Sequence, residues 1–539
     1  MAYRIVSVCI AFAMAFCHSS AHAQFETHQL AQHGLTMHWR ASIGGIGLRN
    51  GDSSVTLWTS RAGKSEVVSV LVKVPQNAVA SRAQSTSLRI KSVSADGKPA
   101  KFVKLSEADR MPEGQEIEVW NVIEQFKASD TDWNKLARSS DAVVNKLGSA
   151  GAREMAESVA KTYRALKRDV EIVSETLDST YLVAINRNGL LTSIDAETGS
   201  IYWQNQLPSY DLNTFGPGVS DEYVAVVNGN HLLVYGLEFG NLVSTQRMQF
   251  VPTGKVMLWK DRVLVPSAGG RVVSYSAIDP AAAPTVVRLG LENRKTLTQS
   301  SDSRFFGWIT DSRLIIAKHD RLPKLWTSIN AETAVPGDAV AVDDGFLFVS
   351  EYGAMIRTNL TSNNAITWRR KFGIPTGSTP VVSKTHAAFV SQNGLLVAAD
   401  LASGLDSWER PIGGMSKVLN ITENRLYAMD QAGKFSIVDV EKGSVLGKIP
   451  AAGYAPLVNN INDRILLISE FGELICLREI DSETPVYTTT KIVDEADAKK
   501  PTEATSPEKS PGETMSGGAS PFEAEKPATE QSVFDPFAG

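Results

Sequence analysis

The sequence contains little cysteine. Three cysteines occur in 539 residues, and two of them, Cys9 and Cys17, lie at the very start of the chain. If that segment is removed, only Cys476 remains, so an intramolecular disulfide is excluded. Cys476 lies in the alternating run GELICLRE, which favours a buried small hydrophobe over a nucleophile. Cohesion must therefore come from the packing of the core.

Long apolar runs and recognisable catalytic motifs are also absent. After the first residues, no run reaches the roughly 18 apolar residues that span a bilayer. The sequence has no G-x-S-x-G, H-E-x-x-H, Walker loop or C-x-x-C. The six histidines that follow residue 23 are too scattered for a metal site: His28, His33, His38, His231, His319 and His386. We therefore expect no catalytic residues, no metal ligands and no cofactor. The formal charge of −5 gives no broad basic surface for nucleic acid.

The first residues have the features of a secretory signal peptide. Arg4 precedes the apolar run 5–17, and an A-x-A cleavage signal ends at Ala23. Phe16 stands where a lipoprotein would have a small residue before Cys17, which argues against lipid attachment. We expect cleavage after Ala23 and export to the periplasm or the extracellular space.

Pairs of glycines ten residues apart mark an internal repeat. In the clearest unit, YLVAINRNGLLTSIDAETGSIYWQNQL at residues 181–207, Gly189 and Gly199 separate three runs, of which the middle one clearly alternates. Glycine suits these turns because positive φ is free of strain only without a Cβ. We count eight such units between about 178 and 480, and four short strands in roughly 40 residues is the period of a β-propeller blade. The acids that begin the turns are expected to bond to backbone amides, not to act in catalysis: Asp195, Asp400 and Asp439.

The unit VAINRNGLLTSIDAETGSIYW resembles the quinoprotein (PQQ)-like β-propeller repeat. In that family, an alternating strand ends in Asp, followed by Thr-Gly and a Trp strand, and here these positions are Asp195, Thr198, Gly199 and Trp203. The chain is most similar to the non-enzymatic branch that includes the propeller lipoprotein of the outer-membrane β-barrel assembly machinery. It lacks the adjacent cysteines that characterise the quinone- and Ca²⁺-dependent dehydrogenases of the family.

This resemblance implies an all-β fold, an eight-bladed propeller of quinoprotein-like type, with seven blades as the alternative. It implies a non-catalytic binding or scaffolding protein of the cell envelope, whose partners are other envelope or extracellular proteins. A PQQ- and Ca²⁺-dependent dehydrogenase and a carbohydrate-binding propeller remain alternatives. We expect four outer-strand tryptophans to lie flat between neighbouring blades: Trp203, Trp326, Trp368 and Trp408.

A ring of blades must tie its last sheet to its first, because otherwise strand edges stay unpaired. The last unit, from Asn462, has no tryptophan strand, whereas MHWRASIGG at residues 37–45 matches that strand far away in the sequence. We therefore predict that the residues from Met37 to Ile43 form the outer strand of the last blade. The alternative is that they begin an N-terminal domain.

The expected organisation has six parts. Residues 46–128 read as mixed strands without the glycine pairing, and residues 129–170 read as two amphipathic helices separated at Gly148 and Gly151. The helices would pack on the propeller or form a partner-binding arm. The tail is rich in Pro, Glu, Ser and Thr and cannot bury a core, although Phe534 and Phe537 could dock on a partner.

The six expected parts are a signal peptide (1–23), an N-terminal segment with the closing strand (24–45), a small β-rich accessory region (46–128), a helical segment (129–170), the propeller (171–485) and a disordered acidic tail (486–539).

Overall fold

The computed structural model describes most residues between Thr27 and Thr488, and all of these lie in one compact unit, Met1–Ile492. The expected signal peptide with cleavage after Ala23 lies outside the described residues, and so does the tail with Phe534 and Phe537. The described ranges are 27–45, 47–48, 54–74, 88–92, 102–104, 117–129, 149–209, 211–288, 296–319, 323–361, 365–482 and 484–488.

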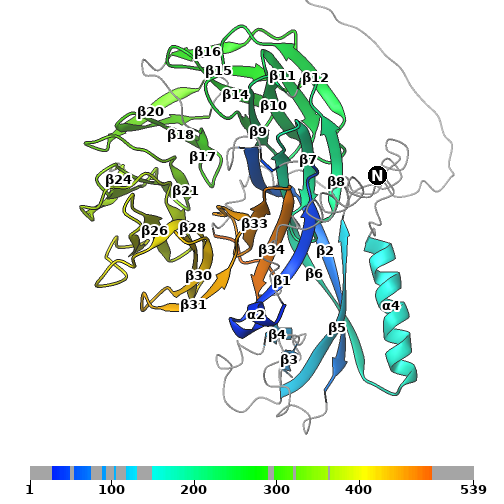
Figure 1. Cartoon of the computed structure of the whole chain (residues 1–539). Helices are drawn as coiled ribbons and strands as arrows, with labels where there is room; N and C mark the ends of the chain where they lie inside the picture. Colours follow the sequence, from blue (N-terminus) through cyan, green and yellow to red (C-terminus); the bar gives the residue numbers. More distant parts are fainter. Residues whose placement is uncertain are drawn as a thin grey trace, which may run out of the picture. The chain divides into compact units, whose positions relative to one another are not determined.

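Antiparallel β-sheets make up almost all of the described structure (Figure 1). Among the described residues, five sheets consist of four consecutive strands. They are β9 (Thr214–Val219), β10 (Tyr223–Asn228), β11 (His231–Gly236) and β12 (Leu242–Arg247); β13 (Met257–Trp259), β14 (Arg262–Ser267), β15 (Arg271–Ser276) and β16 (Thr285–Arg288); β17 (Thr298–Gln299), β18 (Phe305–Thr310), β19 (Arg313–Lys318) and β20 (Lys324–Asn330); β21 (Val340–Val342), β22 (Gly345–Val349), β23 (Ala354–Thr358) and β24 (Ile366–Lys371); and β28 (Met415–Ile421), β29 (Arg425–Asp430), β30 (Lys434–Asp439) and β31 (Val445–Pro450).

Three further sheets depart from this pattern, and two helices accompany the described strands. One sheet has three strands, one takes a strand from the N-terminal end of the chain, and one has seven strands in the order β4-β3-β5-β2-β6-β7-β8. The elements are β25 (Val381–Val382), β26 (His386–Val390) and β27 (Leu396–Asp400); β32 (Tyr454–Leu457), β33 (Ile465–Ser469), β34 (Glu473–Glu479) and β1 (Leu35–Ser42); β2 (Val55–Lys73), β3 (Leu88–Ser92), β4 (Phe102–Lys104), β5 (Ile117–Ser129), β6 (Val170–Ile185), β7 (Leu190–Asp195) and β8 (Ile201–Gln206); and the helices α2 (Thr27–Gln32) and α4 (Ser149–Ala165).

The core lies between neighbouring sheets, which follow one another around a circle in chain order (Figure 1). Leu191 of β7 and Trp203 of β8, for example, share one buried cluster with Val224 and Val226 of the next sheet. A four-stranded sheet has two apolar faces and cannot bury either alone, so each sheet depends on both neighbours. This all-β arrangement of four-stranded antiparallel sheets is consistent with a β-propeller.

The N-terminal strand β1 pairs with the last strand of the chain. It runs antiparallel to β34 from Leu35 opposite Glu479 to Ser42 opposite Glu473. The sheet order β1-β34-β33-β32 therefore joins residues more than 400 positions apart, and Figure 1 shows β1 beside β34. The strand covers most of the residues from Met37 to Ile43 that the sequence singled out.

An indole packed on a glycine turn connects β1 to the first sheet. Trp39 is 7% exposed, and its Nε1 donates a 2.8 Å hydrogen bond to the carbonyl of Ala196, after β7. Gly199 in the same turn has φ +71°, and a Cβ there would lie 2.8 Å from the Trp39 ring. Glycine is required for both the conformation and the close approach. The same contact recurs between later sheets, with Trp203 on the carbonyl of Leu237, Trp368 on that of Leu401 and Trp408 on that of Val440.

The prediction that Trp326 belongs to this set is wrong. Its side chain is 53% exposed and contacts the Phe305 ring of its own sheet. β20 has a bulge between the positions opposite Ile316 and Ala317, and Trp326 is the extra residue there. Trp203 instead occupies a regular paired position on β8. A shift of one residue along a strand turns the side chain to the other face, which explains the difference.

The sequence led us to expect a separate accessory region at residues 46–128, but the described strands β2 and β5 of this range share one sheet with β6. β2 pairs with β6 from Val55 opposite Ala184 to Val72 opposite Val170, and β5 pairs with the other side of β2. The first five residues of β2 therefore complete the sheet β2-β6-β7-β8, and the rest of β2 continues beyond that sheet. Alternation in the sequence identifies a strand but not its partner, so the pattern could not show this continuity.

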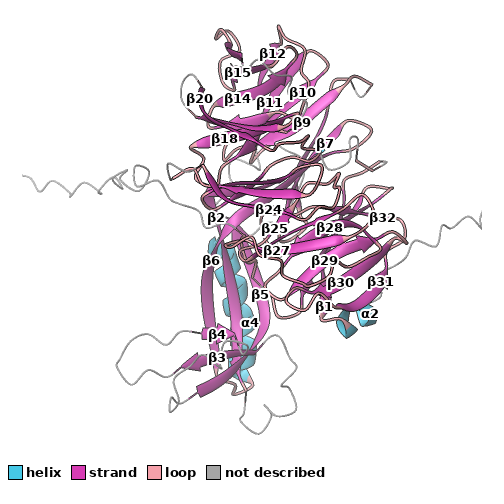
Figure 2. Ribbon diagram, turned by 90° about the vertical axis from the view of Figure 1, so that its left-hand side faces the viewer, coloured by secondary structure: helices cyan, strands magenta, loops and turns pink. Residues whose placement is uncertain are grey.

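Beyond this sheet β2 and β6 continue and, together with β5, form a ribbon with α4 on one face (Figure 2). Three alanines at helical spacing, Ala152, Ala156 and Ala160, are fully buried against Val68 and Val70 of β2. Their small side chains let the helix approach the strands closely. The expected helical segment 129–170 is thus partly realised as α4, which packs on the ribbon, and the residues from 130 to 148 lie outside the described ranges. Gly151, expected to break the helix, lies in its first turn.

None of the helices in the described ranges is long and apolar enough to cross a membrane.

His319 is a buried histidine without a counter-charge in contact. Its ring stacks on Trp259, with centroids 4.4 Å apart and planes 4° apart, and it also faces Phe306 at 4.7 Å. The pKa of His319 is lowered to about 3, mainly by burial; Asp302 opposes this shift and Lys260 adds to it. The imidazole is therefore neutral at physiological pH and acts as a flat ring in the core.

Replacing Trp39 by Ala should lower the free energy of unfolding by about 3–5 kcal/mol, because a buried indole and its hydrogen bond are lost. Trp326→Ala is the matched control and should change it by less than about 1 kcal/mol, since that ring is half exposed. Deletion of residues 24–45 should also lower the melting temperature. Urea and thermal unfolding measure these effects. We call the contact between the last sheet and the first, where Trp39 packs on Gly199, the seam. Equal destabilisation by the two substitutions would contradict a stabilising role of Trp39 at this seam.

His319 should make the protein less stable in acid. Its folded pKa of about 3 lies below the unfolded value of about 6.5. As the pH falls between these values, the unfolded chain binds a proton that the folded chain does not, so the free energy of unfolding decreases by up to ~1.4 kcal/mol per pH unit. Urea unfolding between about pH 7 and pH 4 should show a shallower dependence for His319→Gln. Parallel curves for the two proteins would exclude this role.

Candidate functional site

A cavity of about 890 Å³ lies at the centre of the ring of sheets. Its walls come from the first strand of successive sheets or the loops that lead into it, including β2, β9, β13, β17, β21 and β32. These strands have a pairing partner on their outer side, so their other edge faces the centre. A space of this size can hold a small ligand or a peptide side chain.

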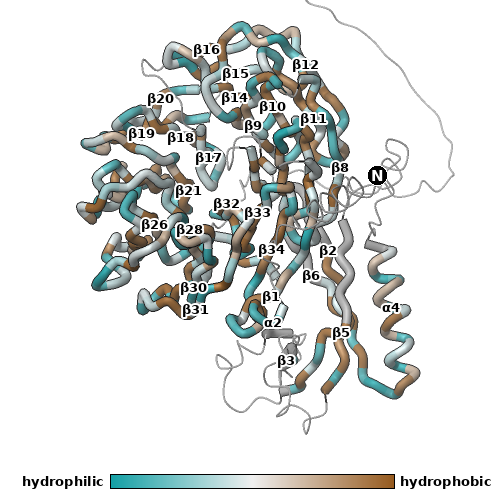
Figure 3. Tube along the Cα trace, in the orientation of Figure 1, coloured by the Kyte–Doolittle hydropathy of each residue, from teal (hydrophilic) through white to brown (hydrophobic). Residues whose placement is uncertain are grey.

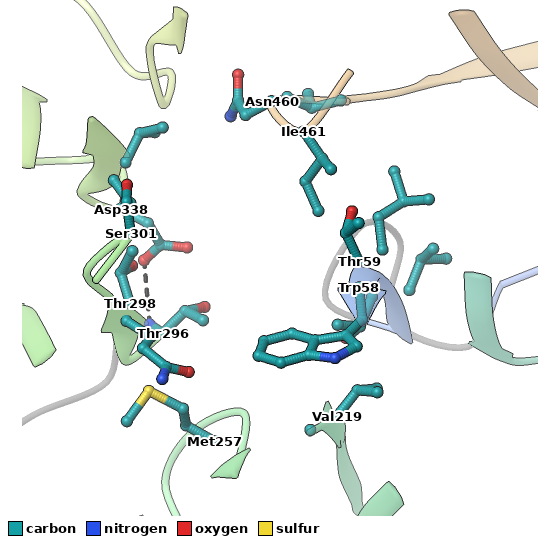
Figure 4. Close-up of a pocket in the computed structure, with 18 of the residues that line it drawn as sticks. Trp58, Thr59, Val219, Met257, Thr296, Thr298, Ser301, Asp338, Asn460 and Ile461 are labelled. Atoms are coloured by element: carbon teal, nitrogen blue, oxygen red, sulfur yellow. Dashed lines mark hydrogen bonds between the residues drawn. The ribbon is translucent and has the colours of Figure 1, made fainter. Parts of the chain in front are cut away.

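Trp58 and a group of polar side chains face each other across the cavity (Figure 4). The Trp58 indole is half-buried, and its Nε1 donates a 3.1 Å hydrogen bond to Asp221. Thr296, Thr298 and Asp338 line the opposite wall. The site therefore has one aromatic wall and one wall of hydroxyl and carboxylate groups.

The polar groups on the second wall tie neighbouring sheets together. The Thr298 hydroxyl donates to the carbonyl of Ala339 at 2.8 Å, which joins the sheets of β17 and β21. The Asp338 carboxylate accepts a bond from the Thr296 amide at 3.1 Å, and the Asp338 amide donates to the hydroxyl of Thr379 in the following sheet at 3.0 Å. The cavity wall thus carries hydrogen bonds between three successive sheets.

Similar bonds continue on the side of β2. Thr56 donates from its hydroxyl to the carbonyl of Pro217 at 2.5 Å, and Lys255 donates from Nζ to the carbonyl of Val55 at 2.7 Å. The side chain of Asn460 accepts a 3.0 Å bond from the amide of Val382, which lies in the three-stranded sheet. These contacts hold the inner strands in position.

The described C-terminal end of the chain also reaches this cavity. Tyr487 lines it, and its hydroxyl lies 3.2 Å from the Thr180 hydroxyl and donates to the carbonyl of Asp178 at 3.1 Å. The amide of Thr488 donates to the carbonyl of Ile461 at 2.8 Å. The segment 484–488 therefore bridges the first and last sheets on the cavity side.

A buried ionic cluster lies at the same seam. Arg464 is 2% exposed, with Nη2 3.1 Å from Glu197 and Nη1 3.2 Å from Asp463. Its Nη1 also donates to the carbonyl of Ser482 at 3.1 Å. Desolvation opposes the charge, but Glu197 and Asp463 raise the pKa of Arg464 overall. The cluster therefore links the last sheet to both the first sheet and the returning C-terminal segment.

The candidate residues from the sequence take structural positions. Asp195, Asp400 and Asp439 each accept hydrogen bonds from backbone amides in the turns that they begin, as predicted. Cys476 is fully buried, and burial raises its thiol pKa, which fits a core residue. In the described ranges, no three His, Cys, Asp or Glu side chains gather as a metal site would require.

Two histidines near the N-terminal end contact residues of other elements. His33 packs against Gly447 of β31, where a larger residue would collide with the imidazole ring. His38 has its Nε2 3.3 Å from Glu197, beside the Arg464 cluster. Both histidines therefore make contacts between elements of the fold. Sequence reasoning missed Trp58, because its strand gave no sign that it would line the centre.

The chain matches the protein-family model described as outer membrane protein assembly factor BamB over residues 135–282 and 316–496, more than half of its length. The chain belongs to this family. The resemblance to quinoprotein-like repeats is therefore confirmed. The match to the BamB family does not include β1 and β2, which complete the last and first sheets.

Solved structures that resemble the chain include the following two. BamB from Moraxella catarrhalis is 14% identical, with a TM-score of 0.45, and the alignment covers 55% of this chain and 93% of that one. The computationally designed Ika8 protein is 11% identical, with a TM-score of 0.39 and coverage of 55% and 92%. These low scores carry no argument about function, so the BamB family assignment depends on the family model. No curated protein matches the chain.

Replacing Arg464 by Met should destabilise the protein by about 3–5 kcal/mol, because it removes the cation beside the buried Glu197 carboxylate. The double variant Arg464→Met, Glu197→Gln should recover part of this loss, since the unbalanced buried charge is then gone. Urea unfolding of the single and double variants tests the coupling. Simple additivity of the two substitutions would show that the pair does not act as a unit.

Proposed function

We propose that this protein is a non-catalytic scaffold of the cell envelope that binds other envelope or extracellular proteins. The match to the BamB family over more than half of the chain carries the proposal. The polar side chains of the cavity support it, because many of them bond to neighbouring sheets and thereby build the wall of a rigid support.

We further propose that the eight sheets of the described residues are the eight blades of one closed propeller. In this interpretation β1 is the outer strand of the last blade, and residues 55–59 of β2 are the inner strand of the first. The propeller would then consist of residues 35–59 and about 178–488, with the ribbon and α4 inserted between the first two strands of the first blade. This replaces the boundary of 171–485 that the sequence indicated.

The proposed location is the periplasm or the extracellular space, after removal of residues 1–23. The motif that ends at Ala23 supports export, and the single remaining cysteine means that folding there needs no disulfide. The sequence-based start of the tail at 486 moves to 489 in this proposal, because Tyr487 and Thr488 bond to the sheets. Residues 489–539, including Phe534 and Phe537, are proposed as an acidic tether that could carry a docking motif for a partner.

The scaffold proposal predicts specific partners in envelope extracts. The tagged mature chain, crosslinked in cells and purified, should retain a defined set of envelope proteins in fixed ratio. The control is an unrelated exported protein that carries the same tag. Recovery of the same proteins by both baits would contradict a scaffolding role.

Reconstitution with PQQ and Ca²⁺ separates the scaffold from the dehydrogenase alternative. We expect the visible absorption spectrum of the repurified protein to show no bound quinone, and dye-linked oxidation of alcohols to stay at the level of a protein-free control. A bound chromophore together with alcohol oxidation would replace the scaffold proposal by the enzymatic one.

A further inference from the structure

The strand β6 has a free edge along half of its length. Its residues Tyr181–Ile185 lie between β2 and β7, but Val170–Leu177 has only β2 beside it. Among the residues that the structure describes, no strand pairs with the other side of this half. Figure 2 shows β6 at the outer edge of the ribbon.

The register identifies which backbone groups this edge presents. The amide of Lys73 donates to the carbonyl of Asp169, so these two residues form a hydrogen-bonded pair of the antiparallel ladder. Successive residues of a strand point their N–H and C=O groups to opposite sides of the strand. The pairing of β6 with β2 continues without a register shift to Leu177. The odd-numbered residues from 169 to 177 therefore bond to β2. The N–H and C=O groups that point outward belong to Val170, Ile172, Ser174 and Thr176.

This edge lacks three features that often prevent strand addition, namely proline, lysine and a bulge. The sequence VEIVSETL contains no proline, glycine or lysine and is rich in β-branched residues. At ~3.3 Å per residue, it offers about 26 Å of uninterrupted strand. Several outer strands of the other sheets, β12, β20, β24 and β31, carry a bulge against their neighbour, which twists the edge.

The edge is held in place before any partner arrives. Val170 and Ile172 pack with Val68, Val70 and the alanine stripe of α4, so one face of the ribbon is fixed by the helix. On the other face, Lys91 forms an ion pair with Glu171. An added strand would thus pair with an ordered template and would not have to organise it, which lowers the entropic cost of binding.

The charge of this strand favours a basic partner over a second copy. Residues 169–178 contain four acids, Asp169, Glu171, Glu175 and Asp178, and no lysine or arginine; Lys91 pairs with one of them, Glu171, so the strand keeps a net negative charge. Antiparallel pairing of two copies would bring acidic strands together, and like charges across a ladder are destabilising. A segment with lysine or arginine would instead gain electrostatic attraction as well as main-chain hydrogen bonds.

We propose that Val170–Leu177 is a docking edge that receives an extended, basic segment of a protein partner as an additional β-strand. This specifies the kind of partner for the proposed scaffold and rests on that function. Recognition is by main-chain hydrogen bonds, so the partner is defined by an extended conformation and positive charge and not by one fixed sequence.

Ser174 provides a matched pair of variants. It is exposed and its amide points outward, so Ser174→Pro removes one edge donor without breaking a bond to β2. Ser174→Ala keeps the amide. The probe is a fluorescein-labelled peptide, Lys-Thr-Val-Lys-Val-Thr-Val-Lys, followed by fluorescence anisotropy, and the control peptide has the same sequence with alternate backbone nitrogens methylated.

We expect the full chain and Ser174→Ala to bind the unmodified peptide equally, and Ser174→Pro to bind it about tenfold more weakly. The methylated peptide should also bind at least about tenfold more weakly, although its charge is the same. Unfolding curves of the two variants should coincide, which shows that the proline acts on binding and not on the fold.

Equal binding of the two peptides would overturn the proposal, because charge alone would then explain the affinity. Equal binding to the two variants would overturn it as well. A dimer of the free protein that Ser174→Pro dissociates would assign the edge to a second copy instead. If no peptide binds while envelope partners are still captured, the docking edge is wrong and the scaffold role stands.

Discussion

Burial of one sheet against the next is the constraint on which this structure depends. The four-stranded sheets are apolar on both faces, so each becomes stable only between two neighbours. A row of such sheets would leave its first and last members exposed. The pairing of β1 with β34, and the packing of Trp39 on Gly199, remove both exposed faces at one seam. The only cysteine in the described ranges, Cys476, is free, so strand pairing and an indole contact connect the sheets there.

Several distant segments converge on this seam. β1 contributes a strand to the last sheet, β2 contributes one to the first, and the segment 484–488 returns to bond with Thr180 and Asp178. The Arg464 cluster lies between the same two sheets. The ribbon with α4 is built from the continuation of β2 and β6, so its base shares strands with the first sheet.

The cavity and the ribbon offer different possibilities for function. Polar side chains in the cavity wall form hydrogen bonds with backbone groups of the neighbouring sheets, which suits a rigid support. The ribbon presents unpaired main-chain groups on an ordered strand. This division agrees with a scaffold whose ring gives stability and whose inserted element meets a partner. The match to the BamB family covers most of the ring and α4 but neither β1 nor β2, so the two strands that complete the seam lie outside it.

The sequence by itself determined the local elements, because glycine turns and two-residue alternation depend only on neighbouring residues. The units with Gly189 and Gly199, the turn role of Asp195 and the burial of Cys476 could all be read in this way. The pairing of MHWRASIGG with the end of the chain was also predictable in outline, since one strand was missing from the last unit. Tertiary structure decided the rest. Whether β2 begins a separate domain or completes the first sheet, whether Trp326 faces a neighbour or solvent, and whether Trp58 reaches the centre all depend on register and on strands far away in sequence, and alternation carries no information about either.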